Sequence, residues 1–161
     1  MHLIYKGDVE VTIKHKKYKL HNNGTEHLFR MFVEMITRGT VAATSLPFYV
    51  MLYKSSSNEI IKKPYTKDHE ENKLLTKYVL LHKYTLEEDT THYVVFDTNI
   101  TPDYRNGTHI EDTDPLCLAL VSQDKLSILA AVDINHDYIT YLNAGNSAIV
   151  KWTMHLENVQ A

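Results

Sequence analysis

The chain has 161 residues, of which 43% are hydrophobic, so its length and composition are typical of one domain, 1–161, with a buried core. A formal net charge of -3 gives no overall attraction to nucleic acid or to anionic lipid, and we expect neither as a partner. The sequence has neither a signal-peptide segment at its start nor a run of about eighteen apolar residues, so we expect synthesis in the cytoplasm without a membrane span.

The first predicted element is a β-hairpin. Val9, Val11 and Ile13 alternate with polar residues, which gives the period of two that an extended strand requires. A turn around His15 then leads to a second short strand near Tyr18. The turn carries a basic cluster, which we interpret as a solvated hairpin tip: Lys14, Lys16 and Lys17.

An amphipathic helix is predicted next, at residues 24–38. Its apolar residues recur at helical spacing: Leu28, Phe29, Met31, Phe32, Val33, Met35 and Ile36. Asn23 followed by Glu26 resembles a capping box at the helix start, and Gly39 fits the left-handed position after the helix end. We therefore expect one helix, preceded and followed by strands.

The remaining apolar segments are predicted to be strands. They cover residues 48–53, 74–86, 92–97, 116–121, 125–132, 138–142 and 147–156, separated by turn signals. Segments 74–86 and 92–97 are expected to pair, because an acidic turn, Glu87 to Asp89, joins them. The pattern predicts a mainly β fold, an antiparallel β-sandwich of about eight or nine strands with one helix, and no βαβ arrangement.

The last predicted strand holds the only tryptophan. Ala148, Val150, Trp152 and Met154 share one parity, so this strand places one face in a core. We expect Trp152 to lie between the two sheets and to contribute on the order of 3 kcal/mol or more to stability.

Two polar segments are longer than hairpin closure requires: Ser55 to Asn72 and Thr101 to Asp114. They are candidate contact surfaces, or else plain solvated loops. The two Asn-Gly-Thr sequences, at Asn23 and Asn106, are interpreted as turns because no secretory signal precedes them.

Two groups of residues in the sequence are considered as possible metal-binding sites. Asp133, His136 and Asp137 could hold a divalent cation, but the same residues form an ordinary turn and match no known ligand spacing. The run from Asp68 to Glu71 allows the same two interpretations. The turn and solvated-loop interpretations are preferred, so no metal ligand is predicted.

Nucleophilic catalysis is not indicated either. Ser45 and Ser55 to Ser57 lack a G-x-S-x-G setting, and Cys117 lies in an apolar run where burial would keep the thiol protonated. The five glycines form no phosphate-binding loop. The eleven tyrosines supply either strand residues or exposed rings for stacking on sugars. We predict a protein without enzymatic activity, with no catalytic residue, cofactor or metal.

The order of these signals resembles that of small virion structural proteins of tailed bacteriophages. The similarity rests on an opening strand, Tyr5-Lys-Gly-Asp-Val-Glu-Val-Thr-Ile13, an entry His21-Asn-Asn-Gly-Thr25 before Leu28-Phe29, and a strand that begins at Pro47. It continues through Thr108-His-Ile-Glu111, Leu118-Ala-Leu-Val121, Ser127-Ile-Leu-Ala-Ala-Val132 and Ile149-Val-Lys-Trp-Thr-Met154. Where that pattern has a glycine-rich segment, this chain has Tyr53-Lys-Ser-Ser-Ser-Asn58.

The resemblance implies a non-enzymatic part of a tail, baseplate, neck or collar, located in the virion after synthesis in the host cytoplasm. Its implied partners are other virion proteins and copies of itself in a symmetric assembly. Two alternatives remain open: a capsid decoration or head-fibre anchor, and a carbohydrate-binding module that attaches to a host glycan through tyrosines.

Overall fold

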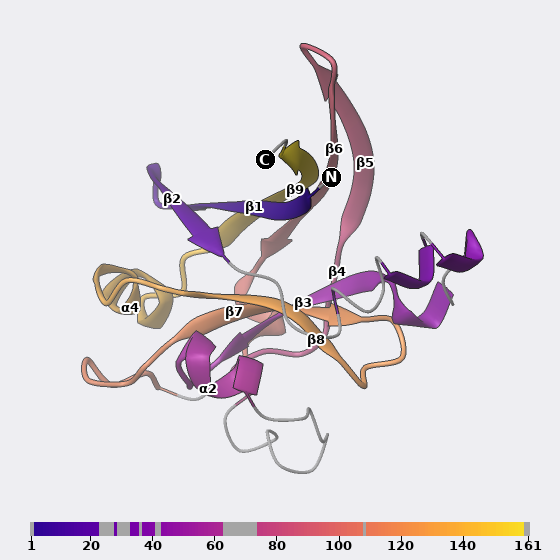
Figure 1. Ribbon diagram of the computed structural model, residues 1–161. Helices are drawn as coiled ribbons and strands as arrows, with labels where there is room; N and C mark the ends of the chain where they lie inside the picture. The colour runs from indigo at the N-terminus through magenta and orange to yellow at the C-terminus, as the bar shows by residue number, and fades with distance from the viewer. Residues whose placement is uncertain are drawn as a thin grey trace.

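The computed structural model describes residues 2–22, 28, 33–35, 37–40, 43–62, 74–107 and 109–159. In these residues nine strands form two antiparallel sheets. Sheet A has the order β2 (Lys16–Asn22), β1 (His2–Ile13), β9 (Ala148–Val159), β6 (Thr91–Ile100) and β5 (His82–Glu88). Sheet B has the order β4 (Val79–Leu80), β3 (Pro47–Tyr53), β7 (Cys117–Ser122) and β8 (Ile128–Asp133). Figure 1 shows sheet A above sheet B, which confirms the predicted β-sandwich.

The main core lies between the two sheets and confirms the role predicted for the last strand. Trp152 has 0% exposure, and its register partners are Val9 on β1 and Phe96 on β6, which are also buried. Val50 on β3 and Leu120 on β7 reach the same cluster from sheet B. The two inner faces therefore close on one another around the tryptophan, and burial of this apolar surface stabilises the fold.

A second core covers the outer face of sheet B. The short helix α2 (Ser57–Lys62) lies on this face and buries Ile60 against Met51, Cys117 and Ala131. Strand β7 is consequently buried on both faces, which explains its unbroken apolar run.

Helix α2 also corrects one prediction, because residues from Ser55 onward were expected to form a loop. Its start is fixed locally by the Ser56 hydroxyl oxygen, which accepts a hydrogen bond from the Glu59 backbone N–H at 3.3 Å. A helix of six residues is too short for its apolar period to be recognised in the sequence.

The prediction of a strand at residues 138–142 is wrong. These residues lie in helix α4 (Asp137–Asn143), which buries Tyr138, Ile139 and Leu142 on one side. In a segment this short, buried positions at i, i+1 and i+4 resemble a buried strand as closely as a helix, and the aromatic and β-branched residues favoured the strand interpretation.

The predicted strand 74–86 is divided by a change of sheet. Leu74 and Thr76 form isolated bridges, β4 then joins sheet B, and β5 begins at His82 in sheet A. At the crossing, Leu81 is buried and its backbone N–H donates to the Phe48 carbonyl at 3.0 Å. The predicted pairing of the later part with 92–97 is confirmed, with β5 and β6 antiparallel.

Part of the predicted helix 24–38 is observed. Leu28 and residues 33–35 and 37–38 are helical. Gly39 has φ of 69° and donates its N–H to the Met35 carbonyl at 3.0 Å, as expected for a helix end. The predicted capping residues Asn23 and Glu26 lie outside the described residues, as do most of the positions before Val33 at which the helix was predicted.

The two hairpins of sheet A have tight turns of the same kind. Ile13 pairs with Lys16 across the two-residue turn Lys14–His15, and the β5–β6 turn is Asp89–Thr90. All four turn residues have positive φ, between 49° and 75°. This geometry matches type I′ turns, whose twist suits antiparallel strands.

Candidate interaction surfaces

Sheet A divides into two arms at one end. The β6–β9 ladder stops at Val94 and Met154, whereas β5 and β6 stay paired as far as Glu88 and Thr91. Strands β1 and β9 continue together to His2 and Val159. The β5–β6 hairpin therefore projects as a separate arm, as Figure 1 shows.

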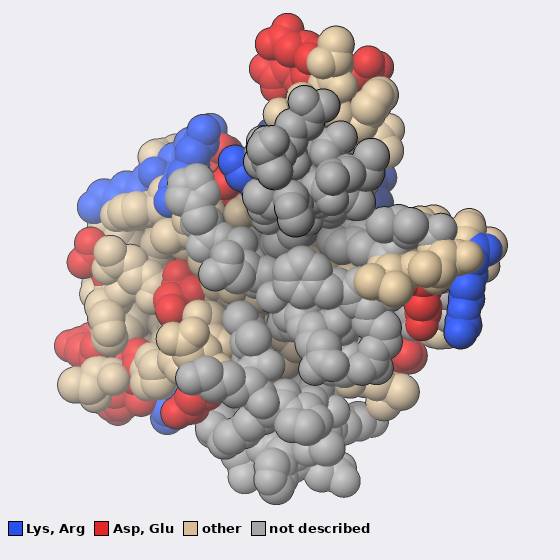
Figure 2. Space-filling model, in the orientation of Figure 1, with Lys and Arg blue, Asp and Glu red and all other residues tan. Residues whose placement is uncertain are grey.

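The end of the projecting hairpin is acidic. Glu87, Glu88 and Asp89 follow one another there, and the His92 imidazole is 3.9 Å from the Glu87 carboxylate. Figure 2 shows the acidic side chains gathered at the end of this arm. We name residues Glu87 to Asp89 the acidic tip.

The turn between β1 and β2 is basic and lies at the opposite end of sheet A, next to the start of β9. We name Lys14, Lys16 and Lys17 the basic tip. The ammonium groups of Lys14 and Lys16 lie 5.7 and 5.2 Å from the ring centroid of Tyr141 on α4. A hydrogen bond with the Tyr141 hydroxyl raises the pKa of Lys16 above its usual value.

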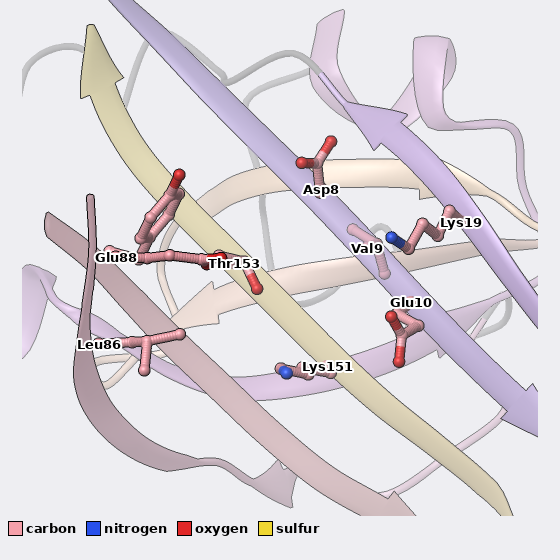
Figure 3. Close-up of a pocket in the computed structure, with 9 residues that line it drawn as sticks. Asp8, Val9, Glu10, Lys19, Leu86, Glu88, Lys151 and Thr153 are labelled. Carbon is pink, nitrogen blue, oxygen red and sulfur yellow. The ribbon is translucent and has the colours of Figure 1, made fainter. Parts of the chain in front are cut away.

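A shallow groove of about 330 Å³ lies on the outer face of sheet A. All five strands contribute to it, mainly with side chains that point to this face, whereas the side chain of Val9 is buried in the main core. Figure 3 shows the residues that line the groove: Asp8, Val9, Glu10, Lys19, Leu86, Glu88, Tyr93, Lys151 and Thr153.

Ionisable side chains follow one another across sheet A in hydrogen-bond register, and three of them, Lys19, Glu10 and Lys151, line the groove. The row runs from β2 to β5 through Lys19, Glu10, Lys151, Asp97 and His82. His82 lies 3.4 Å from the Asp97 carboxylate, and Glu10 forms a 2.9 Å ion pair with Lys17. In the described part of the chain, no carboxylate lies within 4 Å of the Lys19 or Lys151 ammonium group.

The side of the groove nearest the projecting arm is partly apolar. Leu86 on β5 is 44% exposed and pairs in register with Tyr93 on β6. The Tyr93 ring packs edge to face on His155, with centroids 4.9 Å apart. An aromatic ring and an aliphatic side chain therefore face the charged row across the groove.

The three residues considered as a possible metal cluster, Asp133, His136 and Asp137, have other contacts. Both carboxylate oxygens of Asp133 accept hydrogen bonds from Ser57, at 2.7 and 2.9 Å. His136 Nδ1 instead contacts the Asp112 carbonyl at 2.7 Å, and Asp137 begins α4. Among the described residues no group of three metal-ligating side chains occurs. The run from Asp68 to Glu71 lies outside these residues.

Cys117, Ser55 and Ser57, three of the candidate nucleophiles, have structural contacts. Cys117 has 0% exposure in the second core. The Ser55 hydroxyl donates to the Glu59 carboxylate at 3.1 Å, and the Ser57 hydroxyl donates to Asp133. Ser45 ends the short 3-10 helix η1 (Ala43–Ser45).

The candidate contact segment Thr101 to Asp114 is anchored to the body of the protein. It begins with the 3-10 helix η3 (Pro102–Tyr104) and continues with Arg105, which donates to the Leu142 carbonyl at 3.3 Å. Ile110 is buried and exchanges two hydrogen bonds with the Asn143 amide, at 2.7 and 3.0 Å. The Asn106 amide donates to the Leu74 carbonyl, and Gly107, the next residue, has a positive φ of 82°.

Several tyrosines pack inside the protein or along its surface. Tyr138 is buried against the ring of Tyr18, and Tyr49 contacts Tyr78 with the Lys125 ammonium above both rings. Tyr93 is the tyrosine that lines the groove. The sequence could not single it out, because the groove exists only after five strands have paired in the correct order.

Comparison with known proteins found no matching family model, no similar curated protein and no similar solved structure. In the described part of the chain, no helix combines the length and apolar character needed to cross a membrane.

Proposed function

We propose that this protein is a non-enzymatic structural component of a bacteriophage virion, joining tail, baseplate, neck or collar parts through symmetric protein–protein contacts. The observation that carries the proposal is the placement of opposite charges on sheet A, with the acidic tip at one end and the basic tip at the other. The virion setting rests on the sequence resemblance described above.

This placement supports contacts between copies of the chain. An acidic tip on one copy can meet the basic tip of the next, and such a head-to-tail contact closes into a ring or continues as a filament. Each contact between exposed charges is weak, but a ring multiplies the number of contacts. Tight two-residue turns hold both tips, which lowers the conformational entropy lost on contact.

Charge reversal tests the contact. In sedimentation velocity at low salt, we expect the unmodified protein to form oligomers that dissociate as salt is raised. The variant E87K/E88K should be monomeric, as should K14E/K17E. Combining all four changes in one chain restores complementarity and should restore the oligomer.

A matched control separates this effect from net charge. The variant E111K/D112K changes the net charge by the same amount as E87K/E88K but leaves the residues of both tips unchanged, so its oligomers should persist. The virion role is tested by purifying the particles: the protein should be present in a fixed copy number. If it occurs only free in the infected cell, the proposal is wrong.

The alternative position on the capsid surface is tested by electron microscopy of particles that lack the protein. Missing density at the tail or neck supports the proposal, whereas missing density on the capsid supports a decoration or head-fibre anchor.

A further inference from the structure

We propose that the groove on the outer face of sheet A binds a neutral oligosaccharide. This inference concerns a ligand rather than contacts between hairpin tips, although the groove shares Glu88 with the acidic tip, so its test leaves both tips unchanged. It rests on the charge pattern, the apolar side and the backbone geometry of the groove.

The charge pattern favours a ligand without net charge. Lys19 and Lys151 offer N–H donors, Glu88 offers acceptors and the Thr153 hydroxyl offers both. A polyanion would meet the carboxylates of Asp8 and Glu10, and a polycation would meet the two lysines. Sugar hydroxyls can donate to carboxylates and accept from ammonium groups at once, so they match a surface on which both signs alternate.

The apolar side fits the other chemical character of a sugar ring, its C–H face. The contact with His155 holds the Tyr93 ring beside the exposed Leu86. Aromatic rings bury C–H groups at low entropic cost, because a tyrosine side chain has few rotatable bonds. Figure 3 shows Leu86 and Glu88 on one side of the groove, with Lys19 and Glu10 on the other.

Backbone geometry argues against an extended peptide at this place. Peptides that add to a sheet bind at its edge, where backbone N–H and C=O groups are unpaired. In the middle of the groove, at Glu10 and Lys151, the backbone groups of β1 and β9 are already paired with each other. Recognition at this part of the groove therefore depends on side chains, as it does for sugars.

The size of the groove limits the ligand. A volume of about 330 Å³ is at the small end of the roughly 300–1,000 Å³ range of small-molecule sites. Because the groove is an open face, a longer glycan can leave it at either end. We therefore expect a few sugar units to make contact.

The test uses an array of neutral and acidic oligosaccharides, followed by calorimetry with the strongest neutral oligosaccharide found. The full chain should bind neutral members of the array. Y93A and K151A should each weaken binding about tenfold. Y93F keeps the ring and should bind within about twofold of the unmodified protein. Two controls change tyrosines that do not line the groove and should bind unchanged: Y84F on β5 and Y141A on α4.

Three results would overturn the inference. One is an array without binding at millimolar protein, and another is binding that Y93A and K151A leave unchanged. The third is binding restricted to anionic glycans, since this would mean that the two lysines of the groove bind an acidic ligand rather than a neutral one. Equal melting temperatures of all variants exclude unfolding as the cause of any loss.

Discussion

Ser57 and Asp133 are 76 positions apart in the sequence, yet the Asp133 carboxylate accepts hydrogen bonds from both the backbone N–H and the hydroxyl of Ser57. Asp133 ends β8 and Ser57 begins α2. The pair therefore fixes the start of the helix that closes the second core, and the carboxylate caps an otherwise unsatisfied backbone N–H.

Replacing Asp133 by alanine should lower the free energy of unfolding by about 1–2 kcal/mol, because the cap and a charge-assisted hydrogen bond are lost. Urea denaturation of the full chain measures the change. The variant D112A, whose side chain is exposed, is the control and should change stability by less than about 0.5 kcal/mol. Equal stabilities of the two variants would show that the Ser57–Asp133 contact is not stabilising.

The fold was predictable where a local period extended over many residues. The alternation around Trp152 and in Val9 to Ile13 predicted strands that the structure has. The short helices α2 and α4, of six and seven residues, could not be assigned, because so few residues fit both helical and strand periods.

The candidate surfaces were predictable only in part. The lysines of the basic tip and the acidic turn were visible in the sequence, but their positions at opposite ends of one sheet follow from strand order. The groove depends on register between strands up to about 140 residues apart, as for Glu10 and Lys151. Local patterns carry no information about such pairings.

The β5–β6 turn should be stabilised by glycine at Thr90. A β-branched residue is strained at φ of 75°, whereas Asp-Gly is a preferred type I′ sequence. We expect T90G to raise the free energy of unfolding by about 0.5–1 kcal/mol in urea denaturation. The same change one residue later, T91G, lies in β6 and should destabilise the protein by a similar amount. A loss of stability in T90G would contradict the turn assignment.

Removing the Asn143 side-chain amide should destabilise the segment around Ile110. In N143A the two hydrogen bonds between this amide and the Ile110 backbone are lost, which leaves partly buried polar groups unsatisfied. We expect a loss of about 1–3 kcal/mol, measured by urea denaturation. Hydrogen exchange should also become faster at the Ile110 amide. N99A, which changes an exposed asparagine on the outer face of β6, should leave both measurements unchanged.

Two substitutions of Trp152 separate packing from polarity. W152A should cost about 3–5 kcal/mol because it leaves a large cavity between the sheets. The indole N–H is buried without a hydrogen-bond partner in the described part of the chain, so W152F removes an unsatisfied donor as well as some volume. We therefore expect W152F to lower the free energy of unfolding by less than half as much as W152A does. Similar losses in the two variants would show that the indole N–H has a partner.

Alkaline pH should weaken the link between α4 and β1. Burial raises the pKa of Tyr138 above its usual value, and its hydroxyl donates to the Val11 carbonyl at 3.2 Å. The unfolded chain loses this proton above about pH 10 while the folded protein keeps it. The contribution of Tyr138 is therefore complete below pH 10 and falls as the pH rises further.

Comparison with Y138F measures this contribution. At pH 7 and 8 the unmodified protein should be more stable by about 1 kcal/mol, the value of one hydrogen bond, and the difference should be equal at the two pH values. At pH 10.8 the difference should shrink by up to about 1 kcal/mol, because the phenylalanine variant has no proton to retain. Urea denaturation at the three pH values gives the result. A difference that stays constant up to pH 10.8 would mean that Tyr138 ionises as readily in the folded protein as in the unfolded chain.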